Sequence, residues 1–295
     1  MINADSVKGR VNNFAKKNNI QPQTVLHMYF FERFLLRLEK SPYRDNFIIK
    51  GGLLVSQIIG IARRTTLDMD TTIKGLPLTE ENILKIMKEI AFEDVGDGID
   101  FVVDMVKPIR EKDEYENFKV HLTAHLGPMH LRIKIDVTTG DAITPREVEA
   151  KYHCMLDDNS ISLLSYPVET LIAEKYESII AKNIRNTRMR DFYDLYWVVK
   201  LKGSKIDKDV LKEAIVNTCT RRDSLENLEN RDILISQIMQ DDKLASLWED
   251  YKSKNRYVGD LKFNEVLKTL CEIKKNRHPI NLGCFFVLIF GLMPE

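Results

Sequence analysis

The sequence is poor in the residues that build zinc sites and disulfide frameworks. Four of its 295 residues are cysteines, and they lie far apart at Cys154, Cys219, Cys271 and Cys284. No Cys-x-x-Cys pair occurs, the six histidines show no metal-ligand spacing, and no signal peptide opens the chain. We therefore expect reduced thiols, no zinc site and a cytoplasmic protein.

An excess of charge of either sign is also missing. Lys plus Arg number 44, and Asp plus Glu number 44 as well. This balance gives no overall attraction to nucleic acid, so any such contact depends on local basic patches. The chain shows no P-loop and no Ser/His/Asp order typical of hydrolases.

Apolar runs long enough to span a bilayer are absent too. Residues 282–293 read LGCFFVLIFGLM, which is shorter than the roughly 20 residues that a membrane-spanning helix needs. We expect this tail to pack on the body of the protein or on a partner, with a membrane anchor as the alternative. No stable membrane association is expected.

The hydrophobic patterning predicts an α+β (mixed α/β) fold in two parts. Residues 1–160 carry a sheet with helices, and residues 161–295 form a helical domain. The predicted strands are 47–49, 67–73, 99–106, 118–124 and 129–137, with a hairpin turn at 125–128. The predicted helices are 22–39, 53–61, 79–92, 167–180, 190–197, 207–219, 231–252 and 262–274.

Three aspartates are the main candidates for a functional site. Asp68 and Asp70 are two residues apart in a predicted strand, so their side chains share a face, and Asp136 ends an alternating run that could lie beside them. Three carboxylates on one face repel each other unless a cation lies among them. Oxygen ligands of this kind suit Mg²⁺, and we expect two ions when a nucleotide is bound. Coincidental surface charge is the alternative.

A pair of glycines precedes these aspartates. Lys50-Gly51-Gly52 follows a short apolar strand and opens a predicted helix. A lone Gly-Gly or a lone Asp-x-Asp is common in turns and on surfaces. A Gly pair before a helix, Asp-x-Asp on the next strand and a third Asp on a later strand together have the layout of a nucleotidyltransferase palm.

At these residues the chain resembles the AbiEii/AbiGii family of abortive-infection toxins, a nucleotidyltransferase branch that includes MenT-type toxins. The elements are Lys50-Gly51-Gly52, Arg64-x-x-x-Asp68-x-Asp70, Ile135-Asp136-Val137, Glu169-Thr170-Leu171-Ile172-Ala173-Glu174-Lys175 and Arg190-Asp191-Phe192-Tyr193-Asp194-Leu195. The resemblance implies a toxin in phage defence with a separately encoded antitoxin. It also implies a nucleoside triphosphate donor, GTP or CTP, and an RNA acceptor, with the tRNA 3′ end expected.

The resemblance further implies roles for single residues. Asp68, Asp70, Asp136, Lys175 and Asp191 would be catalytic, and the nucleotide would contact Lys50, Gly51, Gly52, Ser56, Arg64 and Lys175. Lys175 would reach the triphosphate, and Asp191 would position it. Leu53 stands where relatives have Ser or Thr, which leaves Ser56 as a substitute hydroxyl. The alternatives are a solvated Lys175, a first-turn acid at Asp191, a structural Lys50 and a surface Arg64.

A basic run follows Lys175. It comprises Lys182, Arg185, Arg188 and Arg190, with no acid between Ser178 and Arg190. Such a run is either a solvated face or a contact for the RNA backbone.

Three functions remain open on this basis. The first is Mg²⁺-dependent transfer of a nucleotide to RNA that arrests growth. The second is a toxin that binds a nucleotide without catalysis, which the missing hydroxyl at Leu53 would suit. The third is nucleotidylation of a small molecule of the antibiotic type, which the basic run disfavours because a cationic drug would need acidic groups.

Overall fold

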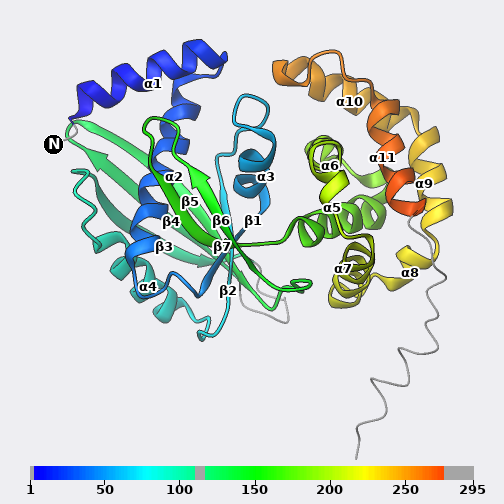
Figure 1. The fold of residues 1–295 in the computed structure, drawn as a ribbon, viewed down its shortest axis with the longest axis horizontal. Helices are drawn as coiled ribbons and strands as arrows, with labels where there is room; N and C mark the ends of the chain where they lie inside the picture. The colour runs from blue at the N-terminus through cyan, green and yellow to red at the C-terminus, as the bar shows by residue number, and fades with distance from the viewer. Residues whose placement is uncertain (1–2, 110–116, 276–295) are drawn as a thin grey trace, which may run out of the picture.

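The computed structural model describes residues 3–109 and 117–275, which form a mixed seven-stranded sheet with helices on both faces (Figure 1). The strand order is β3-β4-β5-β2-β1-β7-β6. The strands are β1 (Phe47–Lys50), β2 (Met69–Ile73), β3 (Asp100–Pro108), β4 (Phe118–Leu126), β5 (Met129–Thr139), β6 (Val148–His153) and β7 (Ser160–Ser165). β2 runs parallel to β5, and β1 runs parallel to β7, while the other neighbours are antiparallel. The α+β class predicted from the sequence is therefore confirmed.

The N-terminal helices cover one face of the sheet. These helices are α1 (Ala4–Asn18), α2 (Pro22–Lys40) and α4 (Glu80–Phe92). Their apolar sides pack on alternate strand residues such as Met69, Ile135 and Val137, which are fully buried. The residues between them, Asp70 and Asp136 included, consequently point to the opposite face.

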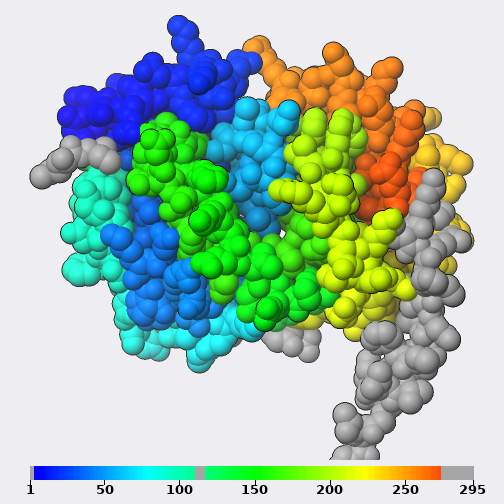
Figure 2. Space-filling model, viewed as in Figure 1, coloured from blue at the N-terminus to red at the C-terminus, as the bar shows by residue number. Residues whose placement is uncertain are grey.

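The opposite face looks toward the helical half of the chain. That half comprises α5 (Val168–Lys182), α6 (Met189–Lys202), α7 (Lys208–Arg221), α8 (Leu225–Glu229), α9 (Arg231–Gln240), α10 (Asp242–Lys254) and α11 (Phe263–Lys275). Its apolar core includes Trp248 and Phe192 and extends to Ile48 of β1. The helix after β1, α3 (Gly51–Ile59), contributes Leu54, Val55 and Ile59 to this same core. The sheet and the helices are thus packed directly together (Figure 2).

The sheet extends further along the chain than the sequence predicted. Strands β6 and β7 were not expected, yet β7 hydrogen-bonds to β1 near the centre of the sheet. The change from sheet to helices therefore follows Ser165, whereas the predicted boundary was residue 160. Alternation is weak in β6 because it is an edge strand with mostly exposed side chains, whereas buried residues recur at every second position of β7.

The helix predicted over 231–252 is in fact two helices. The break falls at Asp241, whose side chain accepts a hydrogen bond from the backbone N–H of Leu244 and so caps α10. Acidic residues favour this capping position, and here the cap outweighs the continuous apolar pattern. The expected 125–128 hairpin turn is confirmed between β4 and β5, where Gly127 has φ +56°.

Two expectations concern membranes and the C-terminal tail. Among the described residues, no helix is both long and apolar enough to cross a bilayer. The apolar stretch at 282–293 lies outside the described residues.

Candidate functional site

A row of four charged side chains crosses four neighbouring strands on the face toward the helices. Lys50 on β1 is the register partner of Asp70 on β2, Asp70 is the partner of Asp136 on β5, and Asp136 is the partner of Lys119 on β4. Register partners on adjacent strands point to the same face, and adjacent strands lie about 4.8 Å apart. The row therefore reads lysine, aspartate, aspartate, lysine, and the two carboxylates are side by side at its centre.

Lys119 is a site residue that the sequence analysis missed. Its ammonium donates to both carboxylate oxygens of Asp136, at 2.6 and 2.9 Å. The predicted hairpin is sufficient to place Lys119 beside Asp136. Once Leu126 pairs with Met129 across the turn, each step back along β4 matches a step forward along β5, and Lys119 falls opposite Asp136.

Asp70 is packed directly against the glycine pair. Its Oδ2 accepts a hydrogen bond from the backbone N–H of Gly52 at 3.2 Å, and a Cβ on Gly51 would lie only 2.1 Å from that oxygen. Gly51 also has φ +60°, which favours glycine. Burial raises the pKa of Asp70 and neighbouring Asp136 adds to this, while the Gly52 N–H, Lys50 and Lys175 oppose it. The glycine pair therefore lets α3 begin against the carboxylate.

The hydroxyl expected from Ser56 does not face the site. Ser56 is fully buried, and its Oγ donates to the backbone carbonyl of Leu53 at 2.8 Å. Leu53 itself is also buried, in the core beneath the sheet. Ser56 therefore does not replace the missing hydroxyl, because its side chain lies, like that of Leu53, in the interior.

Lys50 is held by neighbours on the sheet. Its ammonium donates to Asp141 Oδ2 at 2.5 Å and to Thr138 Oγ1 at 2.7 Å. Burial opposes ionisation of Asp141, but Lys50 and the hydroxyl of Thr138 lower the pKa of this carboxyl overall. This favours the structural reading of Lys50 over a direct nucleotide contact.

Asp68 lies apart from this contact network. It is exposed, just before β2, and its backbone carbonyl accepts a hydrogen bond from Thr66 Oγ1. Across residues 3–109 and 117–275, no three side chains of the His, Cys, Asp or Glu type are grouped as they stand to hold a metal ion. The structure thus brings Asp70 and Asp136 together, whereas Asp68, predicted to share a strand face with Asp70, lies before β2.

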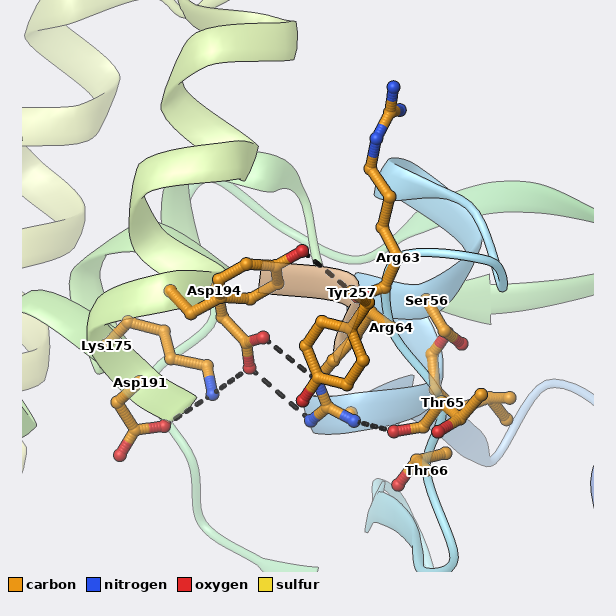
Figure 3. A network of polar contacts seen from close by, with 12 residues as sticks. Ser56, Arg63, Arg64, Thr65, Thr66, Lys175, Asp191, Asp194 and Tyr257 are labelled. Carbon is orange, nitrogen blue, oxygen red and sulfur yellow. Dashed lines mark hydrogen bonds and ion pairs between the residues drawn. The ribbon is translucent and has the colours of Figure 1, made fainter. Parts of the chain in front are cut away.

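Across from the carboxylates, Lys175 is fixed between two aspartates of α6 (Figure 3). Its ammonium donates to Asp191 Oδ1 at 2.6 Å and to Asp194 Oδ2 at 2.9 Å. Burial opposes the charge of Lys175, but Asp194 and Asp191 outweigh it and raise the pKa of this lysine. Lys175 is therefore charged and positioned, and its charge is close enough to favour ionisation of Asp70.

Arg64 was predicted to contact a phosphate, but the structure buries its side chain and pairs it with Asp194. Its guanidinium donates to Asp194 Oδ1 at 2.9 Å, and its side chain is 3% exposed. Asp194 forms ion pairs with both Lys175 and Arg64. Tyr257, from the short 3-10 helix η3 (Arg256–Val258), lies against Arg64 (Figure 3). Sequence reasoning missed this contact because the two segments are far apart in the chain.

The basic run is divided between different surroundings. Lys182 and Arg188 line a groove beside β5, whereas Arg185 and Arg190 do not. Arg185 is exposed, and Arg190 lies near Tyr251 of α10.

Asp194 joins both halves of the site, and we predict that Asp194→Asn destabilises the protein. Burial opposes its ionisation, but Lys175 and Arg64 lower the pKa of this carboxyl overall. At pH 7 the substitution should lower the free energy of unfolding by about 3–5 kcal/mol, because two buried cations lose their shared partner. A folded-state pKa below the unfolded value gives stability that is present above about pH 4 and lost below it. The loss should therefore shrink in acid.

The measurement is denaturant unfolding of wild type and variant at pH 7 and below pH 4. Asp191→Asn is the matched control, because the Asp191 side chain is 13% exposed, against 0% for Asp194, and it contacts Lys175 without touching Arg64. Asp191→Asn should lower the free energy of unfolding by clearly less than Asp194→Asn does. Equal midpoints for Asp194→Asn and wild type at pH 7 would contradict the assignment.

Comparison with known proteins identifies a family over most of the chain. Residues 33–269 match the model of the family described as nucleotidyl transferase AbiEii toxin, type IV TA system. None of the curated proteins matches the chain.

The solved structures that are similar to the chain include two at low sequence identity. The JHP933 protein from Helicobacter pylori is 16% identical, with a TM-score of 0.47, over 90% of this chain and 99% of that one. An antigenic nucleotidyltransferase-like protein from Paracoccidioides brasiliensis is 14% identical, with a TM-score of 0.34, over 76% of this chain and 92% of that one.

The family model spans the whole site, from the helix before the glycine pair to α11. The paired carboxylates, the glycine pair and the Lys175–Asp191 contact all lie within the matched residues. The chain belongs to the AbiEii family of nucleotidyl transferase toxins of type IV toxin–antitoxin systems.

Proposed function

We propose that this toxin arrests growth by transferring a nucleotide from a nucleoside triphosphate to RNA, with tRNA as the expected acceptor and Mg²⁺ as the cofactor. GTP and CTP are the expected donors, and a separately encoded antitoxin is the expected partner. The single observation that carries the proposal is the pair of adjacent carboxylates, Asp70 and Asp136, placed between the glycine pair and Lys175.

The donor set fits a hard divalent cation. Asp70 and Asp136 offer neighbouring carboxylates, and Asp68 stands two residues before Asp70 on the approach to β2. Mg²⁺ held there would neutralise phosphate charge and lower the pKa of the attacking hydroxyl. The ammonium of Lys119 bonds both oxygens of Asp136, so it would compete with an ion for this carboxylate.

The protein's own groups would hold and orient the triphosphate. α3 begins without a side-chain cap, at the glycine pair, and the start of a helix attracts phosphate. Lys175 carries a positive charge toward the same carboxylates from α5. A positioned cation is most valuable where negative charge builds on the leaving pyrophosphate. Asp191 and Asp194 keep the flexible lysine stem in place.

The decisive test supplies each labelled nucleoside triphosphate with MgCl₂ and total RNA. We expect label in RNA with wild type and a loss of at least about 100-fold with Asp70→Asn, because Asn keeps the shape but removes the anion that a dication needs. Growth arrest should be lost as well, while the melting temperature stays near that of wild type. Asp100→Asn, an exposed carboxylate on β3, is the control that should change nothing.

Other outcomes separate the remaining functions. Nucleotide binding by wild type without transfer to any RNA would favour a toxin that acts by binding alone. Label in small molecules with none in RNA would favour the antibiotic-type reaction. Full activity in folded Asp70→Asn would overturn the site.

Lys119 allows a prediction about metal binding without any turnover. Lys119→Met should tighten Mn²⁺ binding to the nucleotide-free protein by about 1.4- to fivefold, since a partly exposed ion pair is worth roughly 0.2–1 kcal/mol. The measurement is calorimetry or the Mn²⁺ resonance signal. Lys107→Met is the matched control, because Lys107 is the register partner of Lys119 on β3. Equal Mn²⁺ affinity in both variants would show that Lys119 does not guard Asp136.

A further prediction concerns Lys175. Lys175→Ala should weaken binding of the nucleoside triphosphate and abolish growth arrest, because the triphosphate loses a cation from the helical half. Calorimetric titration of the nucleotide into a folded variant tests this. Unchanged affinity and unchanged arrest would restrict the site to the sheet.

A further inference from the structure

A basic groove lies next to the carboxylate pair, between the sheet and the helices. It has a volume of about 680 Å³. The sheet contributes Lys50 and Thr138, α5 contributes Ser178 and Lys182, and Arg188 lies just before α6. Arg221 and Arg222, at the end of α7, complete its basic side.

The groove and the glycine pair are on opposite sides of the carboxylates. β5 continues past Asp136 to Thr138, which lines the groove. β1 is antiparallel to β2, so the chain leaves Lys50 in the other direction and reaches Gly51 on the side of Met69. The start of α3 and the groove therefore flank Asp70 and Asp136 from two sides.

This arrangement matches the geometry of phosphoryl transfer. The attacking and leaving oxygens are roughly in line on either side of the reacting phosphorus. In the proposed function the start of α3 holds the phosphates that leave as pyrophosphate. The attacking hydroxyl then approaches from the opposite side, which is the side of the groove.

The charges of the groove suit a polyanion. Lys50 pairs with Asp141, and Arg222 pairs with Glu174 and Glu177, so these two cations are largely balanced. Within the described parts of the chain, Lys182 and Arg188 form no ion pair. Burial lowers the pKa of Lys182, and the charge of Arg188 lowers it further. Two cations that repel each other in one groove are stabilised when a phosphate contacts both of them.

We propose that this groove binds the phosphate backbone of the single-stranded 3′ end of the acceptor RNA, with Lys182 and Arg188 as phosphate contacts. The inference rests on the proposed function and specifies where its acceptor lies. Only half of the basic run takes part, since Arg185 and Arg190 lie outside the groove. This division supplies a control of equal charge from the same segment.

The test compares two double variants, Lys182→Gln with Arg188→Gln and Arg185→Gln with Arg190→Gln. Binding of a short fluorescein-labelled single-stranded RNA is followed by anisotropy across a salt series. The groove variant should bind about tenfold more weakly, and its log–log salt slope should be shallower by about 1.4, because each phosphate contact on a single strand contributes about 0.7. The other variant should bind like wild type, and both should keep the wild-type affinity for the nucleoside triphosphate.

Each other outcome overturns the inference. Equal weakening in both variants would mean a diffuse field without a groove. Loss of triphosphate affinity in the groove variant alone would make the groove a nucleotide site. The binding measurement needs no turnover, so it is independent of the transfer assay. If only the groove variant lost affinity for RNA, the groove assignment would be supported even if wild type transferred no label.

Discussion

The shared ion pair of Asp194 holds the site together. One carboxylate, fully buried, accepts hydrogen bonds from Arg64 before β2 and from Lys175 on α5. A buried charge that loses its partner is costly, so these three elements cannot separate without exposing or leaving an unpaired ion. Arg64 lies six residues before Asp70, and the same contact that orders the helices therefore also orders the approach to the carboxylate strand.

On the sheet side of the site, charge repulsion between neighbouring carboxylates has to be offset. Two adjacent carboxylates repel each other, and the row places a lysine at each end of the pair. The ammonium of Lys50 pairs with Asp141, so the only direct ion pair to these two carboxylates among the four residues of the row is that of Lys119 with Asp136. The carboxylates are thus stable without a metal, and the proposed binding of Mg²⁺ becomes an exchange of one cation for another. Under that proposal, the carboxylates are already in place before the cation binds.

The distribution of charge around the site also separates two kinds of arginine. Arg64 and Arg222 are bound to carboxylates and serve the structure. Arg188 remains open to the groove. A chain without net charge can in this way keep a local basic surface. Such a surface is needed for any contact with nucleic acid, because the chain as a whole does not attract it.

The sequence alone determined the local features of this protein. Strand alternation put Asp70 on the open face, the glycine pair marked the start of a helix, and the 125–128 turn set the β4–β5 hairpin. The family resemblance implied Lys175 and Asp191, and the structure shows their contact. Each of these depends on residues close together in the chain or on a motif with a regular spacing.

Only the tertiary structure decided which partners the charged residues have. Arg64 and Asp194 are 130 residues apart, Lys50 and Asp141 are 91 apart, and no periodicity predicts such pairs. Ser56 pointed inward because α3 packs on both the sheet and the helices. The basic run was divided because η1 (Asn183–Arg185) and the turn into α6 direct its side chains to different surfaces. Local pattern sets the conformation of a segment, but the neighbours of a side chain follow from how distant segments pack, and the role of a charge depends on those neighbours.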